Sequence, residues 1–167
     1  MMKARDVVVA ASGYTGAATP WHRRRIIPIG TYIIATETLE EDLVDQLIPK
    51  DRVITYTRKM VVYYRASPDR KRILFGGRVS LSEANPDKCA NRLHKQLTQI
   101  FPQLENTMVS HSWRGFVGYT FEHMPHTGDK EGVHYAMGYC GSGVSLSSYF
   151  GTKLGQRLAG LPKGNTV

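Results

Sequence analysis

The chain has 167 residues, of which 41% are hydrophobic and 22% charged; these are globular values, and the length is too short for two complete domains. No apolar run approaches the roughly 18 residues of a membrane helix, and two cysteines without a secretory leader make no disulfide framework, so we expect a soluble protein of the cytoplasm. Lys and Arg number 22 against 14 Asp and Glu, and the resulting net charge of +8 suits nucleic acid or a phosphate-bearing ligand without choosing between them.

The first third of the chain predicts two strands and a helix. Val7–Ala11 is a continuous apolar run, typical of a strand covered on both faces, and Ser12–Gly16 closes it with a glycine-containing turn. After the basic run Arg23–Arg25, the β-branched and aromatic residues of Thr31–Thr36 predict a second strand. Leu39–Leu47 has apolar residues at helical spacing behind early acidic residues, which predicts a short helix.

The middle third predicts three strands and a helix. The strand segments are Arg52–Tyr56, Val61–Ala66 and Ile73–Val79. The turn sequence Ser67–Arg70 joins the last two into an antiparallel hairpin. From Asn85 to Phe101 the chain offers an N-cap, a proline at the first helical position and an apolar stripe, so we expect a helix there.

The last third predicts strand, strand, turn and helix. Val109–Phe121 reads as a long strand, Gly132–Met137 as another, Gly138–Gly143 as a glycine-rich turn and Val144–Gly160 as a helix. Strands at both ends, with hairpins and helices between them, indicate an α+β fold with a mostly antiparallel sheet. The inward face of the last helix is expected to hold Leu146, Tyr149, Phe150, Leu154, Leu158 and Leu161.

The glycine-rich turn is the feature with the clearest chemical meaning. A strand, a glycine turn and a helix N-terminus present free backbone N–H groups, which bind an anion or an electron-rich carbonyl. The alternative is that the glycines only let strand and helix pack closely. The spacing G-x-x-G-x-G differs from the dinucleotide fingerprint G-x-G-x-x-G, so the turn alone does not predict a pyrophosphate site.

Other patterns in the sequence are weaker evidence for a functional site. His123 and His126 lack a third ligand, so we expect no metal site. The run Arg23–Arg25 would serve a nucleic-acid-binding module, although such runs are more often solvated loops. A catalytically dead interaction protein is a further alternative.

A set of motifs occurs in a fixed order along the chain. They are Ala11–Thr15, Ile27–Pro28, Tyr32–Glu37, Tyr63–Arg65, Arg72–Arg78, Phe101–Pro102, Trp113–Gly115, Pro125–Gly128 and Tyr135–Val144. Together they resemble the FAD-dependent oxidoreductases of the D-amino acid oxidase and glycine oxidase superfamily, and most of all its gamma-glutamylputrescine oxidoreductase branch. The resemblance extends over about residues 5–161 and implies oxidation of a C–N bond in an amine or amino-acid-like substrate by hydride transfer to FAD.

The resemblance also implies a division of the chain and a set of site residues. Residues 1–30 would be a remnant strand and loop of the FAD-binding domain, 31–120 the substrate domain, and 121–167 a strand, turn and helix that contact FAD. Tyr64 and Trp113 would contact substrate, and no catalytic side chain is assigned. The cofactor-binding positions would be Ser12, Gly13, Gly138, Tyr139, Gly141, Ser142, Gly143 and Val144.

Two positions depart from the family pattern. Family members that oxidise α-amino acids have a carboxylate-binding arginine where this chain has Val117, so the expected substrate is a small amine rather than a free amino acid. Arg65, Arg72 and Arg78 are possible substitutes for that arginine. Glu122 replaces the family's usual aspartate.

A larger departure concerns the nucleotide-binding half. The family opens with G-x-G-x-x-G, which holds the ADP part of FAD, and this sequence has no such motif. We therefore expect the C-terminal portion of a flavoenzyme, inactive and weak in FAD binding by itself. Its partners would be an amine substrate and the missing half, or another copy through exposed apolar surface, with no membrane and no nucleic acid.

Overall fold

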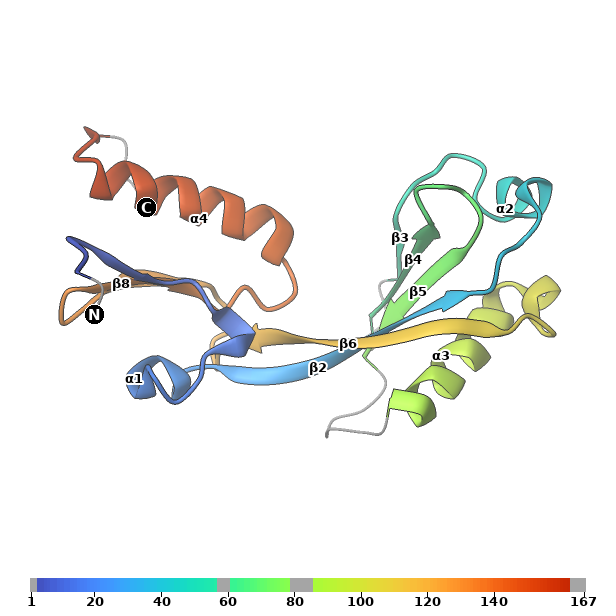
Figure 1. Ribbon diagram of the computed structural model, residues 1–167, viewed down its shortest axis with the longest axis horizontal. Coiled ribbons are helices and arrows are strands. Elements are labelled where there is room, and N and C mark those ends of the chain that lie inside the picture. The colour runs from blue at the N-terminus through green and yellow to red at the C-terminus, as the bar shows by residue number, and fades with distance from the viewer. Residues whose placement is uncertain (1–2, 57–60, 79–85, 163–167) are drawn as a thin grey trace. The chain divides into compact units, whose positions relative to one another are not determined.

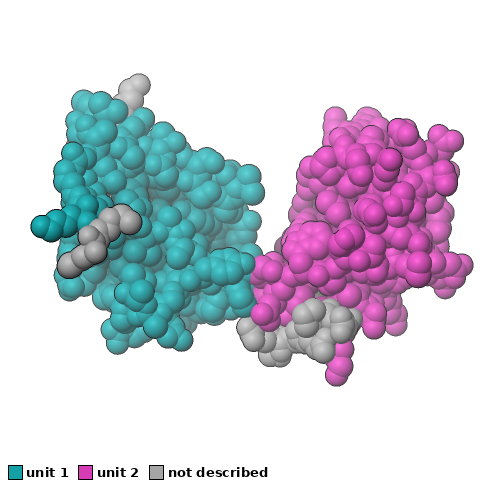
Figure 2. Space-filling view, in the orientation of Figure 1, with its two compact units in different colours: residues 1–29, 116–167 teal, residues 30–115 magenta. Residues whose placement is uncertain are grey.

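The computed structural model describes residues 3–56, 61–78 and 86–162. The chain divides into two compact units (Figure 2): unit 1 comprises Met1–Ile29 and Phe116–Val167, and unit 2 comprises Gly30–Gly115. The assignment of these units to FAD-binding and substrate domains remains a prediction. Within the described residues, no helix has the length and apolar character needed to cross a membrane.

Helices and strands alternate irregularly along the chain, and the α+β prediction is confirmed (Figure 1). The elements are β1 (Val7–Val9), the 3-10 helix η1 (Ser12–Tyr14), α1 (Pro20–Arg23), β2 (Ile27–Thr36), α2 (Glu41–Leu47), β3 (Ile54–Thr55), β4 (Val62–Ala66), β5 (Ile73–Gly77), α3 (Pro86–Ile100), the 3-10 helix η2 (Pro102–Leu104), β6 (Val109–Tyr119), β7 (His126–Lys130), β8 (Val133–Met137) and α4 (Gly143–Leu158).

A five-stranded sheet with the order β3-β4-β5-β2-β6 forms the framework of unit 2. The predicted hairpin is confirmed, because β4 and β5 pair antiparallel from Val62 opposite Gly77 to Ala66 opposite Ile73. At its turn, the N–H of Ser67 donates to the carbonyl of Arg72 at 2.9 Å. The predicted N-cap Asn85 lies outside the described residues.

The core of unit 2 lies between one face of this sheet and the helices α2 and α3. The stripe predicted for α3 is confirmed, since Cys89, Leu93 and Leu97 are fully buried. Burial of such side chains stabilises a fold by about 1.5–3 kcal/mol each. They pack in one cluster with Tyr32, Ile34, Val44, Leu47, Ile48, Tyr64, Ala66, Ile73, Phe75, Ala90 and Leu104.

Unit 1 has a three-stranded sheet with the order β1-β8-β7. β1 runs parallel to β8, and β7 runs antiparallel to it. β7, whose residues are mostly polar, is not among the strands predicted from the sequence. Glu131 and Gly132, the two residues between β7 and β8, have φ of +54° and +77°, the combination of a type I′ hairpin turn, which matches the twist of the strands it joins.

Two burial predictions for unit 1 were wrong. β1 is not covered on both faces, because Val7 and Val8 are 51% and 44% exposed; β1 is an edge strand that pairs only with β8 among the described residues. α4 lies along this sheet (Figure 1) and contacts β8, with Leu154 buried. Tyr149 and Leu161, both expected to face inward, are half exposed.

Candidate functional site

The glycine-rich turn between β8 and α4 has a backbone conformation that side chains rarely adopt. Gly138, Cys140 and Gly141 have φ of +78°, +52° and +102°. A Cβ at Gly138 would lie 2.4 Å from Cγ2 of Thr120, whereas a Cβ at Gly141 would have open space around it to 3.8 Å. Position 138 thus requires glycine for space and conformation, and position 141 for conformation.

Two segments from distant parts of the sequence hold this turn in place. The N–H of Gly138 donates to Oγ of Ser12 at 3.3 Å, and the N–H of Cys140 donates to the carbonyl of Gly118 at 3.1 Å. Oγ1 of Thr120 lies 3.8 Å from Sγ of Cys140. The structure therefore brings together the predicted site residues Ser12 and Gly138, which lie 126 positions apart.

The segment after β1 crosses β6 at backbone-to-backbone distance. A Cβ at Gly13 would lie 2.7 Å from the carbonyl oxygen of Phe116, and one at Gly118 would lie 2.8 Å from the nitrogen of Gly13. The N–H of Phe116 donates to the Tyr14 hydroxyl at 3.1 Å, and the two rings meet edge to face at 5.5 Å. Glycine at 13 and 118 is what permits this crossing.

The N-terminus of α4 follows the fixed turn directly. The first backbone bond of the helix runs from the N–H of Leu146 to the carbonyl of Ser142, at 3.1 Å, so the N–H groups of Gly143, Val144 and Ser145 precede the helical ladder. Ser142 makes no side-chain cap bond, and Val144 is 93% exposed. These donors, at the positive end of the helix dipole, can receive a carbonyl oxygen or an anion.

Tyr139 contributes packing to the turn. Its ring stacks on Phe150 of α4 with centroids 6.5 Å apart, and burial raises the pKa of its hydroxyl. The neutral phenol is therefore favoured even more strongly than usual. The turn offers backbone donors rather than a side-chain acid or base.

Tyr64, predicted to contact substrate, lies in the core of unit 2. Its side chain is 7% exposed, stacks on Phe75 at 5.7 Å and meets Phe101 edge to face at 5.4 Å. Burial, with a smaller effect of Tyr56, raises its pKa. This environment is that of a core residue, and a contact with substrate stays a prediction.

The neighbouring Tyr63 points to the opposite face of the sheet, because side chains alternate along a strand. A Cβ on Gly76 would lie 2.4 Å from its ring, so Tyr63 lies flat over that glycine. Burial raises the pKa of Tyr63, partly offset by a hydrogen bond with Thr31.

Trp113, the other predicted substrate residue, is on β6 and is 43% exposed. It belongs to unit 2, as Tyr64 does, whereas the glycine-rich turn belongs to unit 1. Its exposed ring is accessible to a ligand, and contact with substrate stays a prediction.

The three arginines considered as carboxylate clamps differ in their contacts. Arg65 donates to the carbonyl of Ala66 at 2.8 Å, and Arg72 donates to the carbonyl of Thr36 at 2.7 Å and to Ser110 at 2.8 Å. Arg78, in contrast, has a buried Nε without a hydrogen-bond partner. Arg72 is thus part of the framework, whereas Nε of Arg78 has no hydrogen-bond partner among the described residues.

The histidines expected to bind no metal lie in the loop around β7. Nε2 of His126 is 3.4 Å from a carboxylate oxygen of Glu122, and the ring of His123 meets Tyr119 at 5.6 Å. Within the described ranges, no group of three or more His, Cys, Asp or Glu side chains could hold a metal ion. Cys89 and Cys140 are free thiols.

Comparison with known proteins finds one family and a consistent set of relatives. The sequence pattern of the family described as "DAO: FAD dependent oxidoreductase" matches residues 2–157. The gamma-glutamylputrescine oxidoreductase of Escherichia coli strain K12 is 33% identical over 159 residues, which are 94% of this chain and 37% of that protein. A probable oxidoreductase, OrdL, of Rhizobium meliloti strain 1021 is 33% identical over 86% of this chain and 33% of its own length.

Solved structures share the fold at low sequence identity. The iminodiacetate oxidase of Chelativorans sp. BNC1 matches with a TM-score of 0.72 and 16% identity, over 96% of this chain and 44% of that one. The glycine oxidase of Bacillus cereus ATCC 14579 matches with a TM-score of 0.67 and 17% identity, over 93% and 43%. This chain therefore spans well under half the length of the relatives it matches.

Proposed function

The chain belongs to the family of FAD dependent oxidoreductases, and from that premise we propose that it is the C-terminal portion of an enzyme that oxidises a C–N bond of a small amine. The observation that carries the proposal is the glycine-rich turn, held by Ser12 and followed by the free N–H groups of α4. FAD, when bound, supplies the hydride acceptor.

The turn fits the electron-rich carbonyl edge of a flavin ring. Its positive φ values and the exposed first turn of α4 present backbone donors, which would stabilise negative charge gained by the flavin. Gly138, Tyr139, Gly141, Ser142, Gly143 and Val144 are the proposed contacts at this end, with Ser12 and Gly13 as the segment that supports the turn.

The ADP part of FAD has no corresponding site in this sequence, which contains no G-x-G-x-x-G. We propose that a separate or preceding nucleotide-binding half completes the site. It would pair with the free edge of β1, where Val7 and Val8 are exposed, because an unpaired apolar edge strand favours association. The isolated chain would then be inactive and would self-associate through the same edge.

The proposed substrate is an amine rather than a free α-amino acid. Val117 occupies the position where the resemblance places a carboxylate-binding arginine, and Arg65 and Arg72 are engaged within the protein. Trp113 and Tyr64 remain the proposed substrate residues, and Tyr63, whose side chain lies on the face of β4 opposite Tyr64, is a further candidate.

The test has two arms. In the first, the ¹⁵N-labelled chain is titrated with FMN and its amide signals are followed by NMR; we expect weak binding with shifts confined to residues 138–146. Gly141→Ala should abolish those shifts, since φ at 141 is +102°. The matched control Gly151→Ala, in α4 with open space around its Cβ, should retain them.

In the second arm, the chain is fused behind the nucleotide-binding half of the Escherichia coli relative. We expect about one FAD per fusion protein and bleaching of its absorption by an amine in the absence of oxygen. Tight, stoichiometric FAD on the isolated chain would contradict the fragment proposal. FMN shifts spread over both units, or unchanged by Gly141→Ala, would contradict the flavin-contacting role of the turn.

A further inference from the structure

A pocket in unit 1, distinct from the glycine-rich turn, has no role in the proposed reaction. It has a volume of about 540 Å³, within the range of about 300–1,000 Å³ typical of small-molecule sites. Its lining includes Trp21, Arg24 and Arg25 from α1 and the residues that follow it, and Tyr135 from β8. All of these residues belong to unit 1.

Aromatic rings form one wall of the pocket. The rings of Trp21 and Tyr135 lie 5.5 Å apart, and His22 packs against both at 5.0 Å. His22 is 4% exposed, and its Nε2 has no hydrogen-bond partner. Burial, with the nearby charge of Arg25, lowers its pKa, so the imidazole that supports the rings of Trp21 and Tyr135 is favoured in its neutral form.

Two guanidinium groups border this wall and differ in their contacts. Arg25 is fixed, because it lies 3.7 Å over the centre of the Trp21 ring and donates to the Trp21 carbonyl at 2.9 Å. Arg24 also lines the pocket, and its side chain makes no hydrogen bond or ion pair with any described residue. Its planar fork of donors remains available to a carboxylate.

The acidic residue in the lining does not neutralise this charge. Glu122 pairs with His126 at 3.4 Å rather than with Arg24 or Arg25. The pocket therefore combines an aromatic wall, an available cation and an acidic group that faces a histidine of the same lining. A planar apolar ring with a single negative charge complements this arrangement, because the ring can lie on the aromatic wall while its carboxylate pairs with Arg24.

We propose that this pocket binds a small aromatic carboxylate, with the carboxylate on Arg24 and the ring against Trp21 and Tyr135. The proposal does not depend on flavin binding, because none of these residues belongs to the glycine-rich turn. Its ligand would be a regulator or a carried acid rather than the amine substrate.

The test uses the whole chain with phenylacetate as the probe. Since the sequence has two tryptophans, Trp113→Phe leaves Trp21 as the only indole, and its fluorescence reports binding next to the ring. We expect saturable quenching by phenylacetate. The uncharged isostere phenylacetamide should bind at least about tenfold more weakly, because it cannot pair with Arg24.

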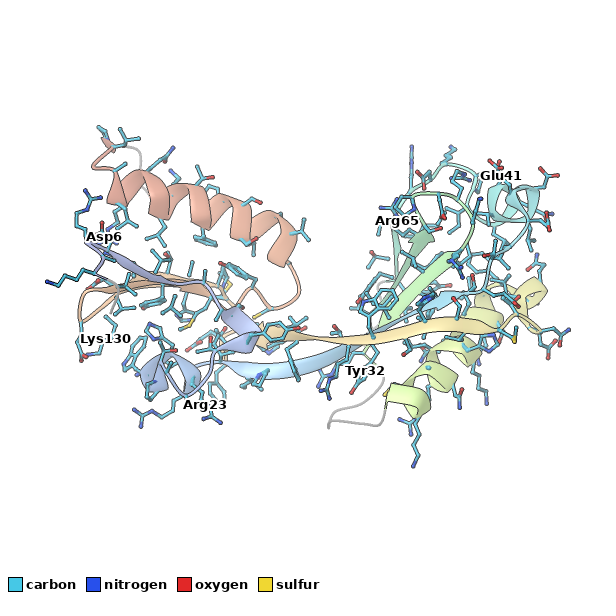
Figure 3. The ribbon with its side chains drawn as sticks, viewed as in Figure 1. Asp6, Arg23, Tyr32, Glu41, Arg65 and Lys130 are labelled. Carbon is cyan, nitrogen blue, oxygen red and sulfur yellow. The ribbon has the colours of Figure 1, made fainter. Side chains whose placement is uncertain are left out.

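Two variants locate the charge. Arg24→Gln in the same background should weaken phenylacetate binding by about tenfold or more. Arg23→Gln is the matched control, because Arg23 ends α1 (Figure 3) and directly precedes Arg24 but does not line this pocket; it should retain affinity within about twofold. The proposal is overturned if phenylacetate does not quench, if phenylacetamide binds equally well, or if both variants lose affinity alike.

Discussion

Ser12 Oγ accepts a hydrogen bond from the backbone N–H of Gly138 at 3.3 Å, which ties the segment after β1 to the turn before α4 across 126 positions of sequence. Ser12 itself has φ of +41°, a conformation that costs free energy for a residue with a side chain. The hydroxyl therefore adds a side-chain hydrogen bond between two segments that the parallel pairing of β1 with β8 brings side by side.

Ser12→Ala should lower the free energy of unfolding by about 1–2 kcal/mol, because it removes the acceptor and keeps the strained φ. Ser12→Gly should cost less, since glycine relieves the strain. Urea denaturation measures both. Ser147→Ala, on the exposed surface of α4, is the control and should hardly change the free energy of unfolding. Equal losses for Ser12→Ala and Ser147→Ala would show that the hydrogen bond of Ser12 does not stabilise the fold.

Gly13→Ala should be among the most destabilising substitutions in unit 1. Its Cβ would lie 2.7 Å from the backbone oxygen of Phe116, and backbone cannot move aside as a side-chain end can. We expect a loss of about 2 kcal/mol or more. Gly151→Ala should instead gain about 0.5–1 kcal/mol, as glycine is a poor residue inside a helix. Thermal melting measures both variants. A melting temperature of Gly13→Ala equal to or above that of Gly151→Ala would contradict the prediction.

Arg72 and Arg78 should respond differently to replacement by glutamine. Arg72 donates to the carbonyl of Thr36 and to Ser110, and a charged hydrogen bond contributes about 1.5–3 kcal/mol. Arg72→Gln should thus lower the stability of unit 2 clearly. Arg78→Gln should change stability by less than about 0.5 kcal/mol, because its Nε has no partner to lose. Chemical denaturation measures the free energy of unfolding of both variants. Similar losses for Arg72→Gln and Arg78→Gln would contradict the prediction.

His22 should make stability depend on pH in a definite direction. Burial, and then the charge of Arg25, lower the pKa of His22 below its ordinary value of 6.5. In the window below 6.5 the unfolded state binds more protons than the folded state, so this contribution is complete above that window and is lost as the pH falls. His22→Phe, which keeps a ring against Trp21, should flatten the slope of stability between about pH 7 and 5.5. An unchanged slope would contradict it.

Patterns that depend on local chemistry were predictable from the sequence. The stripe of Cys89, Leu93 and Leu97 repeats at helical spacing and is buried as expected, since one helix face decides it. The hairpin at Ser67 follows from turn chemistry that only a few residues provide. The glycine-rich turn was visible for the same reason, because few sequences place glycine three times in six positions.

Features set by distant neighbours were not predictable in the same way. The exposure of Val7 and Val8 depends on which elements cover β1. An apolar run in the sequence does not identify those elements. β7 was missed because its polar residues lack strand propensity, and the Glu131-Gly132 turn was the only local signal. Which of the adjacent Tyr63 and Tyr64 faces the core depends on the helices that cover the sheet, and the sequence of β4 alone does not show it.

The parallel pairing of β1 with β8 has a consequence for the order in which the protein forms during its synthesis. Unit 2 is one continuous stretch of chain, whereas unit 1 is assembled from both ends of the sequence. β1 is synthesised before unit 2, whereas its partner Val133–Met137 is synthesised only after unit 2 is complete. Unit 2 can therefore fold while translation continues, and the exposed valines of β1 stay unpaired until β8 has been made, which is the interval in which a chaperone would be most needed.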